Sequence, residues 1–225
     1  MKMYKNRSIL LAAMLLCMTS ALIHAESNCS LELVVEPGNT WTKWVWFGPI
    51  PMKKRPQLAA WIESSDGSFI KTLTVTTSSA DKKWAGNPEG GRPEALPVWT
   101  HAQQNSVPVD TISSATPKKG LCLEQALGSL QPDTEYIIML EVNSSFDYND
   151  QWPKNASEGS AGFSGVNGQP SLIYKASFYA GRPGEYSLRP IGTGSIDGSS
   201  GSIKSGTEGL TSALNIIERA VLILE

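Results

Sequence analysis

The feature that most limits the fold is a series of short strand-like runs, separated by turn formers, with almost no helical periodicity. The clearest pair, residues 57–63 and 69–76, is rich in branched and aromatic side chains and is joined by Ser65-Asp66-Gly67. An Asp-Gly pair between such runs is the strongest short-range signal for a β-hairpin. Similar runs occur at residues 30–35, 134–142, 171–179, 185–189 and 216–224. About seven short strands predict an all-β fold, an antiparallel Ig-like β-sandwich.

Long stretches rich in Gly, Ser and Pro separate these runs. Residues 80–104, 143–168 and 192–209 are predicted to be long loops, and residues 210–213 are predicted to form one helical turn. The first loop contains Trp84 and Trp99, whose rings must find cover. No internal repeat divides the chain, so residues 26–225 are predicted to form one β-sandwich domain.

The first 25 residues have the pattern of a secretory signal peptide. Basic residues precede an apolar run from Ile9 to Ile23, and a small residue, Ala25, follows it. We therefore predict a periplasmic or secreted protein that is cut after Ala25, with an uncleaved anchor as the alternative. No later stretch is long and apolar enough to span a membrane directly.

The charge balance argues against two classes of partner. Removing the three basic residues Lys2, Lys5 and Arg7 with the signal peptide changes the formal net charge from −2 to −5. A mildly acidic chain has no overall electrostatic attraction for nucleic acid or for an anionic membrane.

Two cysteines remain in the mature chain, Cys29 and Cys122. In an oxidising compartment they are able to form one disulfide, which would close a long loop. The alternative is two separate buried thiols.

The sequence offers no catalytic centre. His101 is the only histidine of the mature chain, and it lies in a Pro-rich stretch without a nucleophile elbow. Zinc and iron sites need several His and Cys ligands, which this chain lacks. Oxygen ligands alternate at residues 146–150, but the spacing of a calcium loop is incomplete, so a surface turn is preferred there. We predict no metal site and no catalytic residues; whether the chain is an enzyme stays open, with a non-enzymatic function preferred.

One segment has a distinctive local signature, Asp110-Thr111-Ile112-Ser113-Ser114-Ala115-Thr116-Pro117. It resembles the site at which a bacterial flavin transferase esterifies FMN to a threonine, Asp-x-x-Ser/Thr-Gly-Ala-Thr. Asp110, Ser113, Ala115 and Thr116 match this pattern, and Ser114 replaces the usual Gly. Pro117 favours an extended conformation at Thr116, which is expected to present the hydroxyl outward on an exposed loop.

The wider chain also resembles a known family. Residues 61–63, Pro97-Val98-Trp99, Glu141 with residues 143–147, and residues 165–171 are similar to predicted periplasmic proteins that carry the domain of unknown function 2271. That resemblance implies an association with flavin transfer and membrane electron transfer, because members of the family occur beside components of both. It therefore implies a redox carrier with FMN on Thr116, served by a flavin transferase and a membrane redox protein. Trp99 and Trp84 are candidates to cover the flavin ring.

Two other interpretations use the same residues. Asp110, Ser113 and Ser114 are good turn formers, so the segment is also able to be a plain connection in a cofactor-free periplasmic binding or scaffold domain. A weaker alternative is an adhesive or carbohydrate-binding sandwich that uses exposed aromatic residues on its loops.

Overall fold

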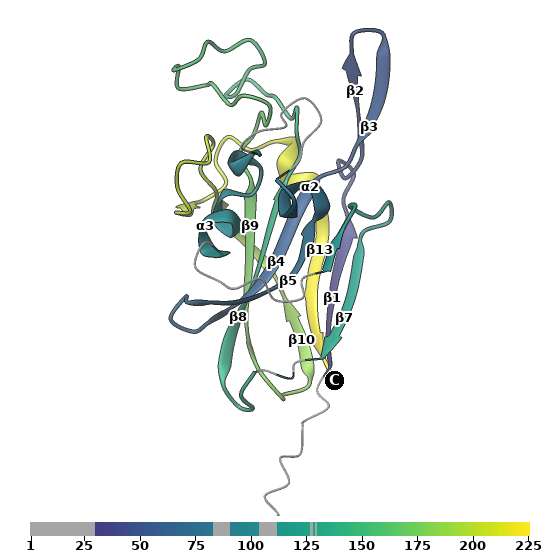
Figure 1. Ribbon diagram of the computed structural model, residues 1–225, viewed down its shortest axis with the longest axis vertical. Coiled ribbons are helices and arrows are strands. Elements are labelled where there is room, and N and C mark those ends of the chain that lie inside the picture. The colour runs from purple at the N-terminus through teal and green to yellow at the C-terminus, as the bar shows by residue number, and fades with distance from the viewer. Residues whose placement is uncertain (1–29, 83–90, 104–111, 127, 129) are drawn as a thin grey trace, which may run out of the picture.

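The computed structural model describes residues 30–82, 91–103, 112–126, 128 and 130–225. These residues form an all-β sandwich of two main sheets, with a separate two-stranded hairpin at one end (Figure 1). The predicted fold class is confirmed. The predicted signal peptide and Cys29 lie outside the described residues, so the cut after Ala25 and the disulfide with Cys122 stay predictions.

The smaller main sheet has four antiparallel strands and joins both ends of the described chain. Its order is β10 (Gly184–Ser187), β13 (Ile217–Leu224), β1 (Ser30–Pro37) and β7 (Leu121–Ala126). Strand β1 lies between β13 and β7, with Leu33 opposite Leu222 on one side and Leu123 on the other. The first strand is therefore held in place by two strands that lie far from it in sequence.

The larger sheet has seven strands. Its order is β12 (Lys204–Ser205), β11 (Arg189–Thr193), β9 (Leu172–Tyr179), β8 (Glu135–Asn143), β4 (Gln57–Ser64), β5 (Phe69–Thr76) and β6 (Ile112–Ser114). All neighbours are antiparallel except β5 and β6, which run parallel. The predicted Asp66-Gly67 hairpin between β4 and β5 is present, and Gly67 takes the positive φ of +86° that its turn requires.

The main core lies between the two sheets. Strand β1 alternates between buried and partly buried residues, as expected for a strand with one covered face. Its fully buried members include Leu31 and Leu33, which pack with Leu140 of β8 and Phe178 of β9 in one apolar cluster.

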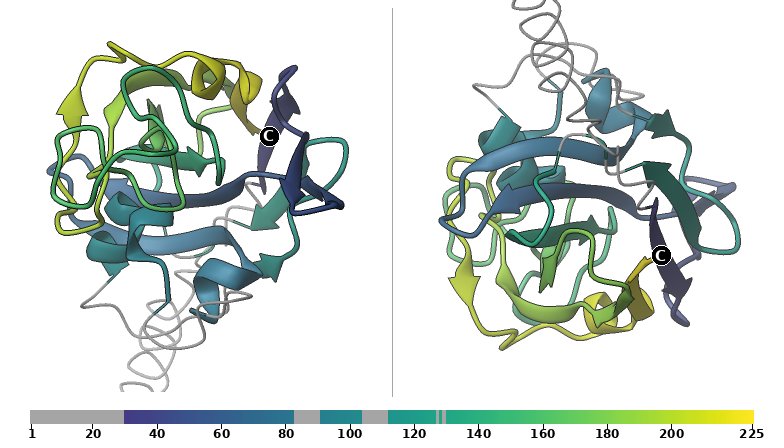
Figure 2. Two further views of the ribbon diagram at one scale, coloured as in Figure 1. Left: turned by 90° about the horizontal axis from the view of Figure 1, so that it is seen from above. Right: turned by 90° about the horizontal axis from the view of Figure 1, so that it is seen from below.

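A second apolar cluster covers the outer face of the larger sheet. The short elements η1 (Pro93–Ala95) and α3 (Pro97–Ala102) pack Val98 and Trp99 against Trp61 of β4 and Met139 of β8. Figure 2 shows α3 and the short α2 (Thr77–Ala80) against β4 and β5. The centre of the sheet is thus buried on both faces, which explains why the sequence of β4 and β8 does not alternate cleanly.

The hairpin of β2 (Lys43–Phe47) and β3 (Ile50–Lys54) was not predicted and projects from one end of the sandwich (Figure 1). Its two strands pair only with each other in the described chain. A predicted helical turn at residues 210–213 appears slightly later, as η3 (Ser212–Asn215). Within the described residues, no helix is long and apolar enough to cross a membrane.

The position of Leu33 predicts a large effect on stability. Because its side chain is fully buried between the sheets, Leu33→Ala should lower the free energy of unfolding by about 2–5 kcal/mol in urea titrations. Leu214→Ala, at a side chain that is largely exposed, should cost about 1 kcal/mol or less. Equal losses for the two variants would contradict this arrangement of the core.

Candidate functional site

The segment with the flavin-site signature begins at the edge of the larger sheet. Strand β6 pairs in parallel with β5, with Val75 opposite Ser113 and Thr76 opposite Ser114. Asp110 and Thr111 lie outside the described residues, and for Ser113 and Ser114 only the backbone is described. The structure therefore places the second half of the motif on a three-residue edge strand and in the link that leads to β7.

Within that link, Ala115 is exposed but Thr116 is buried, with 7% of its surface accessible. The Thr116 hydroxyl donates a hydrogen bond of 2.5 Å to the carbonyl oxygen of Pro56. The expectation that Pro117 turns this hydroxyl outward is wrong, because the Pro56 carbonyl, sixty residues away in sequence, offers it a buried acceptor. A transferase can reach the oxygen only after local opening of the segment.

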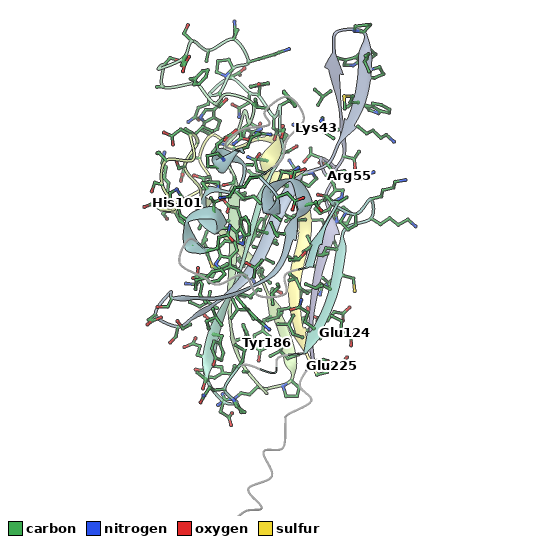
Figure 3. All side chains as sticks on the ribbon, in the orientation of Figure 1. Lys43, Arg55, His101, Glu124, Tyr186 and Glu225 are labelled. Carbon is green, nitrogen blue, oxygen red and sulfur yellow. The ribbon has the colours of Figure 1, made fainter. Side chains whose placement is uncertain are left out.

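The same link is fastened to both legs of the projecting hairpin. The Trp41 indole, just before β2, donates a 2.9 Å hydrogen bond to the carbonyl oxygen of Pro117. Arg55, just after β3, donates one of 3.3 Å to the carbonyl oxygen of Thr116. Figure 3 shows Arg55 at the base of the hairpin, close to the body of the sandwich. Thr116 thus lies at the base of the hairpin, in a link that is bonded to both of its legs.

Two residues next to Pro56 have buried polar atoms without a hydrogen-bond partner among the described residues. Arg55 Nε and Gln57 Oε1 flank Pro56, and both are buried and make no hydrogen bond in the described part of the chain. Ser79 Oγ, in the helix that follows β5, is in the same condition. Buried polar groups are normally paired with protein or with water, so these atoms have hydrogen-bonding capacity that no described protein group uses. The Arg55 guanidinium contacts the backbone of Thr116, and a guanidinium is a group that would suit the phosphate of a threonine-linked FMN, so the residues fit that group.

A pocket opens near the same end of β5. Among the residues that line it are Ser79, Arg92, Leu96 and Trp99, around about 430 Å³ of empty space that includes its open mouth. The Trp99 indole is buried, and it donates a 2.9 Å hydrogen bond to Thr72 Oγ1. This burial leaves little of the Trp99 ring for a flavin, and the predicted stacking partner Trp84 lies outside the described residues.

Trp99 is positioned by a fully buried carboxylate, that of Glu141 in β8. Glu141 accepts hydrogen bonds from the backbone amides of Trp99 (2.8 Å) and Val98 (3.2 Å), and from Ser171 Oγ (2.6 Å). The carboxylate thereby fixes the start of α3 to the centre of the sheet. The local pattern does not predict this role, since an acidic residue inside a strand usually faces solvent.

Burial raises the pKa of Glu141 to about 7, although the hydrogen bonds from Ser171, Trp99 and Val98 oppose the shift. The three groups that hydrogen-bond to the carboxylate are all donors and favour its charged form, but the loss of water around it outweighs them. Glu141 therefore titrates near neutral pH while remaining a structural anchor.

The other residues considered in the sequence have structural roles. His101 Nε2 lies 3.0 Å from the carbonyl oxygen of Gly198, which ties α3 to the loop after β11. Asp147, in the candidate calcium turn, forms an ion pair of 3.0 Å with Lys43 of β2. Cys122 is exposed and donates a hydrogen bond to Glu32. The described residues contain no cluster of His, Cys, Asp and Glu side chains that could hold a metal ion.

Comparison with known proteins gives one family match. Residues 51–143 match the family described as "Predicted periplasmic protein (DUF2271)". The match runs from β3 to the end of β8, so it includes Thr116 and Glu141 but not the resemblance noted at residues 165–171. Neither the curated proteins nor the solved structures contain a match to the chain.

The environment of Glu141 predicts a pH-dependent stability. Between pH 4.5, its ordinary pKa, and about 7, the folded state keeps a proton that the unfolded state has lost, so stability falls as pH rises. That shift corresponds to about 3 kcal/mol of unfolding free energy, measured by urea titration at several pH values. Glu141→Gln should abolish this decline, and it should cost about 1–3 kcal/mol because its amide nitrogen meets donors. The exposed control Glu218→Gln should keep the decline, and loss of the decline in both variants would assign it to other groups.

Proposed function

We propose that this chain is a periplasmic redox carrier that holds FMN covalently on Thr116 and exchanges electrons with a membrane partner. The single observation that supports it most is the buried, unpaired Arg55 Nε beside the last threonine of the flavin-site motif. The motif alone is short, and the guanidinium adds to it a group that can bind a phosphate. The family match agrees with a periplasmic location and includes this threonine.

Arg55 is suited to the charge that the modification introduces. A phosphodiester on Thr116 Oγ1 carries one negative charge, and it replaces a hydroxyl that now donates to the Pro56 carbonyl. The modified oxygen has no proton to donate, so the link has to shift and bring the phosphate towards the guanidinium. The planar guanidinium has several donors, and it can bind a phosphate while it retains a backbone carbonyl.

Attachment requires a separate flavin transferase and local opening. In that reaction Thr116 Oγ1 loses its proton and bonds to the phosphorus of the FMN half of FAD, while the diphosphate bond breaks and AMP leaves. Strand β6 has three residues, pairs on only one side among the described strands, and precedes a link that belongs to no strand. Such edge segments open at low free-energy cost. The attached flavin would supply the redox chemistry, and this chain would hold it and limit its exposure.

A cofactor-free periplasmic binding domain is the second candidate. One observation favours it, since the Thr116 hydroxyl is buried and satisfied by Pro56, as an ordinary structural threonine would be. On this account the link between β6 and β7 only supports the hairpin above it.

Modification in cells separates the two candidates. The mature chain produced in the periplasm together with a flavin transferase should gain the mass of one FMN less one water, seen by intact-mass spectrometry. Thr116→Ala should abolish the gain because it removes the acceptor oxygen. Thr111→Ala, which changes a variable position of the motif, should retain it. An unmodified wild-type chain beside an active transferase would leave the binding-domain candidate.

The need for opening predicts that a weaker link is modified faster. Trp41→Phe keeps a buried ring but removes the hydrogen bond to Pro117, which is worth about 1 kcal/mol. The initial rate of FMN incorporation should therefore rise about fivefold, because 1.4 kcal/mol corresponds to tenfold in the open population. Trp152→Phe, at another buried tryptophan, should leave the rate unchanged. A rate that is unaffected by Trp41→Phe would mean that opening of this link does not limit access.

A further inference from the structure

The projecting hairpin of β2 and β3 exposes large apolar side chains on both of its faces. From the pairing of Trp44 with Lys53 and of Trp46 with Pro51, the two tryptophans share one face. Ile50 and Met52 alternate with Pro51 and Lys53, so they lie on the other face. Trp44 and Trp46 are 59% and 65% exposed, and Ile50 and Met52 are 60% and 41% exposed.

No described strand or helix covers these side chains. An isolated two-stranded hairpin is marginally stable in water, and this one has no third strand or covering helix among the described residues. Exposed apolar groups that cluster in this way mark a site of interaction. A fluid apolar medium can cover both faces of such a ribbon at once.

Basic side chains lie on the hairpin and on the link that is bonded to its base. Lys53 lies over the Trp44 ring, with its Nζ 5.1 Å from the ring centre. Lys118 and Lys119 are exposed and directly follow Thr116 and Pro117, whose carbonyl oxygens bind the two hairpin legs. The acidic group described at this base, Asp147, is already paired with Lys43. The end of an otherwise acidic molecule is therefore locally basic.

A second apolar element rises from the same end. The loop between β8 and β9 stands beside the sandwich end that carries the hairpin (Figures 1 and 2). It presents Phe163 and Val166, each 38% exposed, together with the charged residues Asp150, Lys154 and Glu158. The Lys43–Asp147 ion pair joins the bases of the hairpin and the loop, so the two are held together.

We propose that this end of the protein docks on an anionic phospholipid bilayer, with the hairpin tip in the interface and Lys53, Lys118 and Lys119 at the headgroup phosphates. Tryptophan is enriched at the interfacial depth of membranes, where its apolar ring and polar N–H are both accommodated. Lysines near the surface add attraction to anionic lipids, which falls as salt rises. The negative net charge of the chain predicted no attraction to an anionic membrane, but a net charge does not show that these lysines gather at one end of the fold. This inference stands without the flavin.

Co-sedimentation of the mature chain with lipid vesicles tests the proposal. Binding to vesicles of phosphatidylglycerol mixed with phosphatidylcholine should exceed binding to pure phosphatidylcholine, and it should weaken with added salt. Trp44→Ala with Trp46→Ala should weaken binding at least about tenfold, since two interfacial aromatic anchors are lost. Lys118→Glu with Lys119→Glu should do the same for the anionic vesicles.

Matched controls lie at the opposite end, where the turn between β9 and β10 adjoins the C-terminal strand. Tyr179→Ala removes an exposed aromatic ring and Arg182→Glu reverses an exposed charge, and neither should change binding. All four mutated sites that matter are exposed, so the variants should unfold at wild-type urea concentrations. Absence of binding to anionic vesicles would overturn the proposal. Wild-type affinity of the double tryptophan variant for these vesicles would also overturn it. So would binding to native membranes that is lost when the membranes are treated with protease and is not reproduced with vesicles of pure lipid.

Discussion

The hydrogen bond from the Thr116 hydroxyl to the Pro56 carbonyl joins the parts of this molecule that bear on function. It seats the link between β6 and β7 beneath the β2–β3 hairpin, and Trp41 and Arg55 hold the same link from the two hairpin legs. The acceptor oxygen of the proposed modification is therefore also a structural contact. Any reaction at Thr116 Oγ1 has to break this hydrogen bond, and its loss would weaken the attachment of the link to the base of the hairpin.

The proposed carrier and the proposed membrane contact suit each other physically. A carrier that exchanges electrons with a membrane partner gains effective concentration by residing at the bilayer surface. Thr116 lies two residues from Lys118, so the modified residue would sit at the basic, hairpin end of the molecule rather than at the opposite end. On the outer face of the larger sheet, Glu141 fixes the start of α3 through two backbone hydrogen bonds.

The sequence predicted those parts of the fold that depend on local signals. The Asp66-Gly67 hairpin and the strands β1, β4, β5, β8, β9 and β13 follow from turn chemistry and branched residues, and the structure contains them. Helix α3 lies in a Pro-rich stretch that was predicted to be a loop. Its six residues are stabilised by packing on the sheet and are too few to show a helical periodicity in the sequence. The hairpin of β2 and β3 carries apolar residues on both faces, so it lacks the alternation by which a half-buried strand is found.

At the site, the motif was visible locally, but the burial of Thr116 depends on a carbonyl sixty residues away. The burial of Glu141 could likewise not be predicted, because its hydrogen-bond partners lie in α3 and just before β9, far from it in sequence.

The most direct test of the carrier account is peptide mapping of the protein purified from its own host. Proteolysis followed by mass spectrometry should find the peptide that contains Thr116 carrying one FMN, with the fragment ions placing the flavin on that threonine and a visible absorption band that survives denaturation. A colourless protein in which this peptide has its unmodified mass, although the host contains an active flavin transferase, would contradict the account.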